Sequence, residues 1–346
     1  MFYKFVNLPI FTEIGSNILN RFETILQENN LYFKKPLILT GDTSGNIIKG
    51  YSFYNAFEKH HIGMYYDEDL IINIRKEIID EGFDLIIGCG GGRIIDLGKY
   101  LSSETLTPFI SIPTILSNDG VSSPISILRL DGSYRRVGST MPIGVAIDIN
   151  IIKSSPTIYL KAGLGDLISN VSAFYDWNLA YRRRKDRYDN FSAMMAYMAA
   201  SNVLDKMSSY DNIVGTDFLI DLARGLVVSG ISIAIARTSR PASGSEHSIS
   251  HALDRILGPN RRPHGIQVGF ATLLTLYLQG QRKLMESLKK FYRKVGFPVT
   301  FLELGISKET FVEAVKLAPS IRERYTILNE VSKGEIMEAI EEVYEG

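Results

Sequence analysis

Short apolar runs alternate with a helical repeat in the first part of the chain, and this alternation restricts the fold more than any other feature. Residues 36–40, 84–88 and 109–113 each have the composition and length of a buried strand. Between the first two runs, residues 67–82 carry isoleucine and leucine at helical spacing. Buried strands that alternate with amphipathic helices are typical of a parallel sheet covered on both faces. We therefore expect an α/β domain at the N-terminus.

The pattern changes near Pro156. Residues 189–207, 218–237 and 310–317 carry helical periodicity, and no further strand signals follow. Proline disfavours helix at the residue before it, so the two serines that precede Pro156 are a plausible domain boundary. We expect the second part of the chain to be all-helical.

Charge and cysteine content exclude several classes of protein. The chain has 38 basic and 38 acidic residues, so its net charge gives no basis for binding nucleic acid or an anionic membrane. A single cysteine, Cys89, excludes an intrachain disulfide and indicates a reducing cytoplasm. We expect no membrane span, because no uncharged apolar stretch reaches about 18 residues. The longest apolar run, residues 225–236, is expected to form a buried core helix.

A glycine-rich turn follows the second predicted strand. Residues 88–92 read Gly-Cys-Gly-Gly-Gly, and a helix is predicted to begin near Arg93. Glycine lets the backbone approach a ligand closely, and a helix N-terminus offers free N–H donors to a phosphate. The spacing differs from the GxGxxG fingerprint of dinucleotide sites. By itself the turn fits a pyrophosphate site and a plain strand-to-helix turn equally well.

Three of the five histidines lie close together in the sequence. His247 and His251 are four residues apart in a predicted helix and so share one face, and His264 follows in a predicted loop. Histidines with a nearby carboxylate are natural transition-metal ligands. Asp166 is the best carboxylate candidate, and the glycines of residues 163–166 predict a sharp turn with Asp166 at the start of a helix. Surface or capping histidines are the alternative, which three histidines beside glycine-rich turns disfavour.

Five motifs follow one another along the chain: residues 90–96 (GGGRIID), 111–124 (SIPTILSNDGVSSP), 163–166 (GLGD), 244–254 (GSEHSISHALD) and 264–269 (HGIQVG). In this order they resemble the motifs of the archaeal-type sn-glycerol-1-phosphate dehydrogenases, and the resemblance spans residues 35–271. The segment around Asp119 is its most specific part. The family shares a superfamily with glycerol dehydrogenases, iron-type alcohol dehydrogenases and dehydroquinate synthases.

The resemblance implies a dehydroquinate synthase-like fold and a set of site residues. Residues 1–155 would be an α/β Rossmann-like nucleotide-binding domain, and residues 156–346 an all-α domain that binds metal and substrate. One zinc ion would be held by Asp166, His247 and His264. The substrate would contact Asp119, Asp166 and His251, of which Asp119 and His251 are the catalytic candidates. NAD or NADP would be bound by Gly92, Arg93, Ile94, Ile95, Asp96, Thr114, Ile115, Leu116, Ser117 and Ser123.

The implied activity is the NAD(P)H-dependent reduction of dihydroxyacetone phosphate to sn-glycerol 1-phosphate, for the backbone of archaeal membrane lipids. The enzyme would be cytoplasmic and homo-oligomeric, with a small-molecule substrate as its partner. One alternative is a glycerol dehydrogenase or metal-dependent alcohol dehydrogenase, which the Asp119 segment disfavours. A dehydroquinate synthase-like lyase would need more lysines and arginines in the motifs. A non-catalytic binding protein is disfavoured because every candidate ligand is retained.

Finer assignments leave alternatives open. Asp42, just after the first predicted strand, fits either a contact with the adenosine ribose or a turn. Arg255, Arg261 and Arg262 surround the histidine motifs and are either ligands of the substrate phosphate or solvated loop residues. After the last histidine motif relatives often carry an acidic residue, and this chain has Ile266. If that acid orients the neighbouring histidine, metal affinity differs here.

Overall fold

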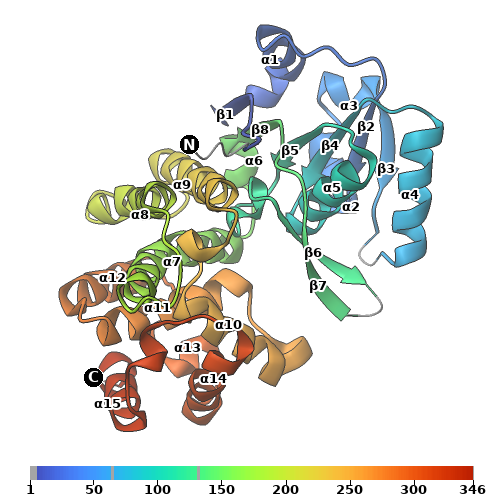
Figure 1. Ribbon diagram of the computed structural model, residues 1–346. Coiled ribbons are helices and arrows are strands. Elements are labelled where there is room, and N and C mark those ends of the chain that lie inside the picture. The colour runs from blue at the N-terminus through green and yellow to red at the C-terminus, as the bar shows by residue number, and fades with distance from the viewer. Residues whose placement is uncertain (1–5, 64–65, 131–132, 346) are drawn as a thin grey trace. The chain divides into compact units, whose positions relative to one another are not determined.

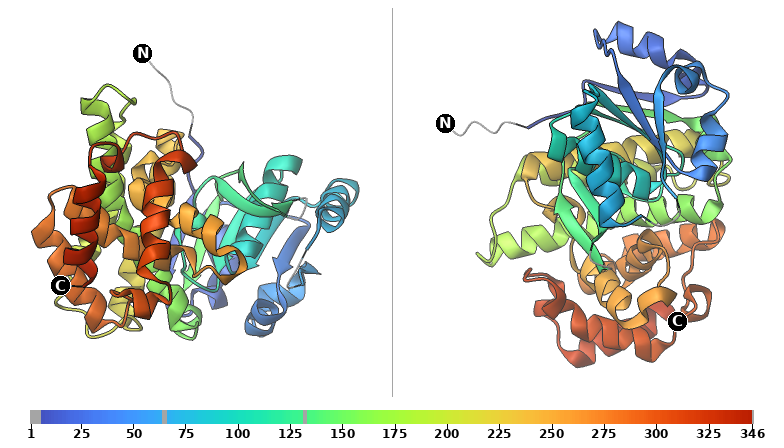
Figure 2. Two further views of the ribbon diagram at one scale, coloured as in Figure 1. Left: turned by 90° about the horizontal axis from the view of Figure 1, so that it is seen from below. Right: turned by 90° about the vertical axis from the view of Figure 1, so that its right-hand side faces the viewer.

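The chain forms two compact units, Met1–Ser155 and Pro156–Gly346, in a computed structural model that describes residues 6–63, 66–130 and 133–345 (Figure 1). Among the described residues every strand belongs to the first unit, and the second unit contains helices and loops (Figure 2). The predicted fold class, an α/β part followed by an all-helical part, is confirmed.

A six-stranded sheet forms the centre of the first unit, in the order β1-β8-β5-β4-β2-β3, and all its neighbouring strands are parallel. The sequence predicted β2, β4 and β5, each to within two residues. It missed β1 and β3, which lie at the two edges and are not continuous apolar runs, and it missed β8. The strands are β1 (Phe11–Gly15), β2 (Pro36–Thr40), β3 (Glu58–His61), β4 (Leu85–Gly90), β5 (Phe109–Pro113) and β8 (Gly144–Asp148).

Alternate residues of the central strands pack into two separate cores, one on each face of the sheet. Ile38 and Ile87 contribute to the first core, and Leu37 and Ile86 to the second. This alternation follows from the period of two in a strand, and it explains why β2, β4 and β5 are buried at every position. The first core includes residues of α1 (Phe22–Glu28), α2 (Asp42–Ile48), α3 (Ser52–Ala56) and α6 (Ile149–Lys153), and the second of α4 (Glu68–Asp80) and α5 (Gly92–Thr105).

A hairpin of β6 (Ile125–Leu130) and β7 (Ser133–Gly138) follows β5, and its two strands pair antiparallel. The short helix η2 (Asp119–Val121) joins β5 to this hairpin. Neither strand was predicted from the sequence. The hairpin places the motif around Asp119 between the sheet and an antiparallel ribbon.

The second unit is built from α7 (Thr157–Arg182), α8 (Asn190–Asp205), α9 (Thr216–Ala236), α10 (Ser245–Leu257), α11 (His264–Leu278), α12 (Arg282–Lys294), α13 (Phe301–Leu304), α14 (Lys308–Ile321) and α15 (Lys333–Tyr344). The short helices η3 (Arg240–Ala242), η4 (Gly258–Asn260) and η5 (Ile327–Asn329) complete it. Among the described residues, α9 is the one helix long and apolar enough to cross a bilayer by length and composition. Its most apolar window is 72% buried, as expected for the core helix that the sequence predicted there.

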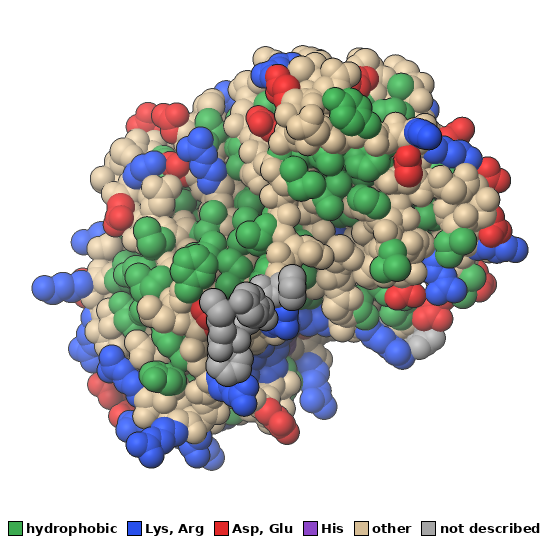
Figure 3. All heavy atoms as spheres, turned by 45° about the horizontal axis from the view of Figure 1, so that its top comes forward, with side chains coloured by type: hydrophobic (Ala, Val, Ile, Leu, Met, Phe, Trp, Pro, Cys, Tyr) green, Lys and Arg blue, Asp and Glu red, His purple; other side chains and the backbone are tan. Residues whose placement is uncertain are grey.

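The surface carries charges of both signs. On the face drawn in Figure 3, apolar side chains form patches, and lysine, arginine, aspartate and glutamate side chains lie interspersed around them. This mixture agrees with the formal net charge of zero. The face drawn therefore has no extended region in which all charged side chains carry the same sign.

The prediction of a sharp turn at residues 163–166 is wrong, because this segment lies inside α7. A Cβ on Gly165 would lie 2.1 Å from the carbonyl oxygen of Gly265 in α11, so the glycine lets two helices pack with their backbones in contact. His264 was predicted in a loop and is instead the first residue of α11. The close approach of α7 and α11 therefore sets the relative position of Asp166 and His264.

We expect Gly165→Ala to lower the free energy of unfolding by about 1–3 kcal/mol, because the added methyl group must separate α7 and α11. The same shift should reduce the metal bound per chain, since Asp166 is the next residue of α7. Urea titration and elemental analysis would measure both effects. Gly334→Ala in α15 is the matched control, because a Cβ there meets no atom closer than 3.9 Å. Equal losses in the two variants would contradict the packing argument.

Candidate functional site

Three helices of the second unit bring Asp166, His247 and His264 together. The Oδ1 atom of Asp166 lies 3.6 Å from Nε2 of His247 and 3.9 Å from Nε2 of His264. Candidate ligand atoms of all three residues lie within 4.8 Å of one another. Ligand atoms of a tetrahedral zinc ion are about 3.3 Å apart, given bonds of about 2.0–2.1 Å. Closing the present spacing to that value needs only small side-chain movements, so the residues fit one ion.

Glu246 orients His247 by contacting the ring nitrogen that does not face Asp166. The Nδ1 atom of His247 lies 3.0 Å from Oε1 of Glu246, which leaves Nε2 facing Asp166. The Glu246 carboxylate is buried and accepts hydrogen bonds from the backbone N–H of Gly244 and from the hydroxyl of Ser172. A histidine ligand whose second nitrogen is held by a carboxylate is the usual arrangement at metal sites. The sequence-based reasoning missed Glu246, whose only sequence signal is that it precedes His247.

His264 is oriented without a carboxylate behind it. Its Nδ1 atom lies 3.1 Å from the hydroxyl of Ser250, and its Nε2 faces Asp166. The side chain of Ile266 is buried, so the Ser250 hydroxyl is the polar group at Nδ1 of His264. Gln267 in turn donates hydrogen bonds to Ser250 and to Asp254.

Burial and neighbouring charges move the pKa values of the two histidines in opposite directions. Burial, followed by the proximity of His247, lowers the pKa of His264 to about 3. Burial also acts to lower the pKa of His247, but the carboxylates of Asp166 and Glu246 outweigh it, and that pKa is raised. A neutral imidazole is the form that binds a metal. His264 is therefore held in its ligand form at neutral pH.

His251 lies one turn beyond His247 on α10 and outside the Asp166 cluster. Its ring stacks on that of His264 with the centroids 5.5 Å apart, and its Nε2 atom lies 2.6 Å from a guanidinium nitrogen of Arg322. Burial lowers the pKa of His251, and Arg322 lowers it further against the opposing effect of Asp254. Through Nε2 the neutral ring can accept a hydrogen bond from Arg322.

A second group of candidate ligands comprises His251, Asp254 and His264. It shares His264 with the first group, and none of its three residues is fully buried. The guanidinium of Arg322 beside His251 would repel a cation held there. Asp166, His247 and His264 are therefore the better metal site.

The candidate cofactor residues of the first unit lie at and just beyond the carboxyl ends of two neighbouring strands. The adjacent strands β4 and β5 end there, and the N–H of Thr114 donates to the carbonyl oxygen of Gly90 at 3.0 Å. A Cβ on Gly91 would lie 3.0 Å from the side chain of Ile115. Helix α5 begins at Gly92 with no acidic residue in its first turn and no side-chain cap, which leaves its positive end available to an anion.

The individual side chains of this group differ in what they can contact. Those of Ile94, Ile95 and Leu116 are buried among apolar residues, so a cofactor could reach only their backbone. Arg93 and Ser117 are partly exposed, whereas Thr114 and Ser123 are buried. Asp42, the alternative ribose contact, is exposed at the start of α2. These assignments remain predictions.

Lys99 connects α5 to the segment that contains Asp119, a role that the sequence-based reasoning missed. The side chain is fully buried, and its Nζ lies 2.9 Å from Oδ1 of Asp96. The same ammonium donates to the carbonyl oxygens of Gly120 at 2.8 Å and Ser123 at 3.1 Å, and also to that of Ile125. Asp96 was predicted to bind the cofactor, and its carboxylate also accepts from the N–H of Ile127.

Asp119 itself lies at the start of η2, where the side chain of Asn118 accepts from the N–H of Gly120. Its charge acts on Arg136 of β7, because partial desolvation lowers the pKa of that arginine and Asp119 opposes the shift. Its predicted contact with the substrate remains a prediction.

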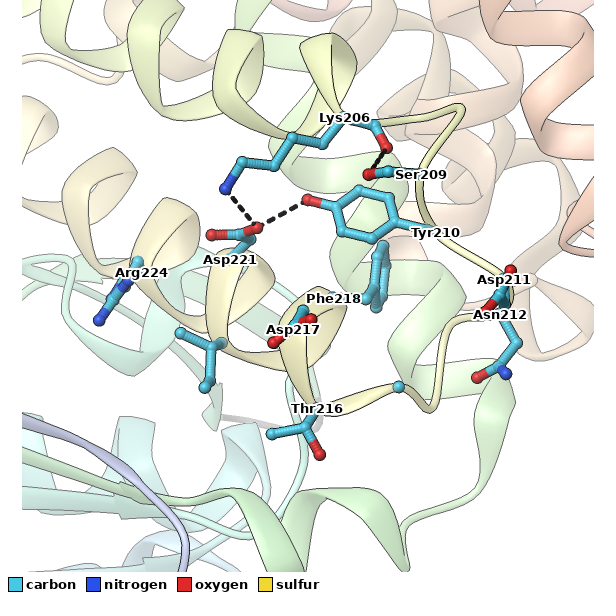
Figure 4. A pocket seen from close by; sticks show the side chains of 12 residues that line it. Lys206, Ser209, Tyr210, Asp211, Asn212, Thr216, Asp217, Phe218, Asp221 and Arg224 are labelled. Atoms are coloured by element: carbon cyan, nitrogen blue, oxygen red, sulfur yellow. Dashed lines mark hydrogen bonds and ion pairs between the residues drawn. The ribbon is translucent and has the colours of Figure 1, made fainter.

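A cavity of about 560 Å³ lies between the end of α8 and the start of α9 (Figure 4). Its most buried charged group, Asp221, accepts hydrogen bonds from Lys206, Tyr210 and Asn202. With three donors on one carboxylate, the group stabilises the connection between the two helices. None of the predicted site residues lines this cavity.

The sequence and the fold were compared with known proteins. A family profile described as iron-containing alcohol dehydrogenase matches residues 13–156. Among solved structures, glycerol dehydrogenase from Schizosaccharomyces pombe has a TM-score of 0.76 at 20% identity and covers 99% of this chain and 91% of its own. A probable glycerol dehydrogenase from Sinorhizobium meliloti has a TM-score of 0.75 at 19% identity, with 98% of both chains covered. At this identity the two likenesses establish the fold.

Curated relatives are more similar in sequence. A glycerol-1-phosphate dehydrogenase [NAD(P)+] from Methanococcus vannielii is 37% identical over 96% of this chain and 98% of the relative. A protein of the same name from Archaeoglobus fulgidus is 35% identical over 96% of this chain and 95% of the relative. A third, from Nitrosopumilus maritimus, is 40% identical over 75% of this chain and 72% of the relative. Identity at this level over nearly the full length shows that the chain belongs to the glycerol-1-phosphate dehydrogenase family.

Proposed function

We propose that this protein is an NAD(P)-dependent dehydrogenase that reduces dihydroxyacetone phosphate to sn-glycerol 1-phosphate. The observation that carries the proposal is the convergence of Asp166, His247 and His264 in a chain whose relatives bear the name glycerol-1-phosphate dehydrogenase [NAD(P)+]. Three protein ligands leave one position of a tetrahedral ion open, which is typical of a catalytic metal site.

We propose that the ion is zinc. Two imidazoles and one carboxylate suit zinc, and they also suit iron or nickel, so metal analysis has to decide. When bound, the ion would act as a Lewis acid on the C2 oxygen of the substrate. Glu246 and Ser250 would keep His247 and His264 in the orientation that binds it.

The other predicted residues would hold the two reactants. The N-terminus of α5 at Gly92 would bind the cofactor pyrophosphate, with Thr114 to Ser117 and Ser123 along the nicotinamide and ribose. Hydride would pass between C4 of the nicotinamide and C2 of the substrate. His251 would contact the substrate hydroxyl or relay its proton, since its neutral ring lies beside the His264 ligand. Asp119 would also contact the substrate.

We propose a cytoplasmic location from the state of the cysteine, and a homo-oligomer from the family resemblance. Cys89 is fully buried, and burial raises the pKa of its thiol, so it is unreactive. A chain with one inert cysteine suits a reducing cytoplasm. A homo-oligomer is expected from the resemblance, and light scattering would test it.

Oxidation of NADH and NADPH with dihydroxyacetone phosphate tests the proposed function. We expect turnover with at least one of the two cofactors, loss of nearly all activity after chelation, and recovery with zinc. In reverse, only the sn-1 isomer of glycerol phosphate should react. If dihydroxyacetone phosphate is inert and free glycerol or dihydroxyacetone reacts, the protein is a glycerol dehydrogenase, the alternative named from the sequence.

A further inference from the structure

Arg322 lies directly after α14 and reaches back to the histidine helix. Its guanidinium donates to the hydroxyl of Ser243 at 2.8 Å and lies 2.6 Å from Nε2 of His251. The residue is partly buried, with an extended backbone that ends the helix. Two anchors on different elements fix the plane of the guanidinium, which lowers the entropy lost when it binds a ligand.

The position of Arg322 relative to the metal ligands matches the shape of the substrate. His251 separates its guanidinium from the cluster, and the His251 ring is 5.5 Å from that of His264 and 6.5 Å from that of His247, between centroids. In dihydroxyacetone phosphate, C3 and one ester oxygen separate C2 from phosphorus. A substrate with its C2 oxygen at the cluster can therefore extend its phosphoryl group past His251 to the guanidinium.

Neighbouring arginines are committed to protein groups. Arg240 forms an ion pair with Asp186 at 2.6 Å, and Arg324 donates to the carbonyl oxygen of Ser243 at 2.9 Å and to the hydroxyl of Ser239. These contacts fix the segment that carries Ser243. Because Ser243 also accepts from Arg322, they position one of the two groups that orient the Arg322 guanidinium.

The arginines that the sequence suggested for the substrate phosphate are less suitable. Arg262 donates to the carbonyl oxygens of Leu304 at 2.8 Å and Gly305 at 3.3 Å, which ties it to α13. A guanidinium nitrogen of Arg261 lies 3.7 Å from a carboxylate oxygen of Asp254, whose negative charge disfavours a second anion. Arg255 is exposed at the end of α10.

We propose that Arg322 binds the phosphoryl group of the substrate, oriented by Ser243 and His251, and so selects a phosphorylated over a free triose. The inference rests on the proposed function, because it assumes that the substrate carries a phosphate. Arginine forms two parallel hydrogen bonds with phosphate oxygens, and such charge-assisted bonds are among the strongest in proteins.

Kinetics of Arg322→Ala and Arg322→Lys test the proposal. We expect Arg322→Ala to raise the KM for dihydroxyacetone phosphate at least about 30-fold, the factor that corresponds to losing a charge-assisted contact. The kcat/KM for unphosphorylated dihydroxyacetone should fall by a much smaller factor, because a substrate without phosphate loses only the orienting contact of Arg322 with His251. Arg322→Lys should lie between the two, because lysine keeps the charge and loses the paired geometry. Lys316→Ala, which removes an exposed positive charge from α14, is the matched control and should match the wild type.

Calorimetric titration of the metal-loaded proteins with inorganic phosphate separates this inference from the proposed function. Weaker binding by Arg322→Ala, at wild-type metal content, supports the subsite even if dihydroxyacetone phosphate proves not to be the substrate. Unchanged phosphate affinity and unchanged KM in Arg322→Ala overturn it, while turnover by the wild type leaves the proposed function intact. If Arg322→Ala does not fold, Arg322→Lys decides, since a KM equal to the wild type would refute the paired contact.

Discussion

Asp166→Asn is expected to lose its bound metal and to lower kcat/KM for dihydroxyacetone phosphate at least about 1000-fold, since Lewis-acid stabilisation contributes several kcal/mol. The Oδ1 atom of Asp166 faces the Nε2 atoms of both His247 and His264, and the side chain is the only acidic member of the cluster. An amide of the same shape removes the negative charge that a divalent ion requires. Elemental analysis and steady-state kinetics on the same preparation would measure both effects.

Asp217→Asn is the control for Asp166→Asn, because it makes the same chemical change at an exposed position on α9. Its metal content and activity should match the wild type. If Asp166→Asn keeps one ion per chain and near-normal activity, the ion is bound elsewhere. The second candidate group, His251, Asp254 and His264, would then be the site, and Asp254→Asn would abolish binding.

Lys99→Met is expected to lower the free energy of unfolding of the first unit by about 3–5 kcal/mol, the usual cost of removing one partner of a buried ion pair. The substitution leaves the Asp96 carboxylate and three backbone carbonyls of the Asp119 segment without their shared donor. Each of these acceptors is costly to bury unpaired. The affinity for NADH or NADPH should also fall, because α5 and the Asp119 segment lose their connection. Urea unfolding and cofactor titration would measure the two effects.

Lys76→Met on α4 is the matched control for Lys99→Met, since this lysine is exposed. Its stability should stay within about 0.5 kcal/mol of the wild type. A loss in Lys99→Met no larger than in this control would show that the buried ammonium contributes little. Normal cofactor affinity in a destabilised Lys99→Met would separate the structural role from the binding role.

The candidate site was predictable where its signal is local. The spacing of His247 and His251 predicts one helix face, and α10 places both there. The glycine-rich turn predicts an anion-binding helix start, and α5 begins at Gly92 with its first turn free of acidic side chains. Asp166 was chosen among the carboxylates for the glycines that precede it, and the family resemblance implied the same residue. Short-range periodicity carries this information because it depends only on the repeat of a helix or strand.

Where the prediction failed, the decisive contacts are distant in sequence. Residues 163–166 were predicted as a turn because glycine usually breaks a helix, yet α7 continues through them so that it can pack against Gly265. The contact between Arg322 and His251 joins residues 71 positions apart, and no local pattern reveals it. Lys99 looks like any helical lysine until its three carbonyl partners fold back over it.

The sequence by itself determined the fold class, three of the four inner strands of the sheet and the chemical identity of the candidate ligands. Apolar runs and helical repeats record how each segment is buried, and the motifs record which side chains are present. The tertiary structure decided which candidate ligands converge, which groups orient them and that Arg322 contacts His251 next to them. Those outcomes depend on helix packing and on hydrogen bonds between remote segments, such as Glu246 with Ser172 and Arg322 with Ser243. Such contacts form only when the whole unit folds, because each partner alone is compatible with many environments.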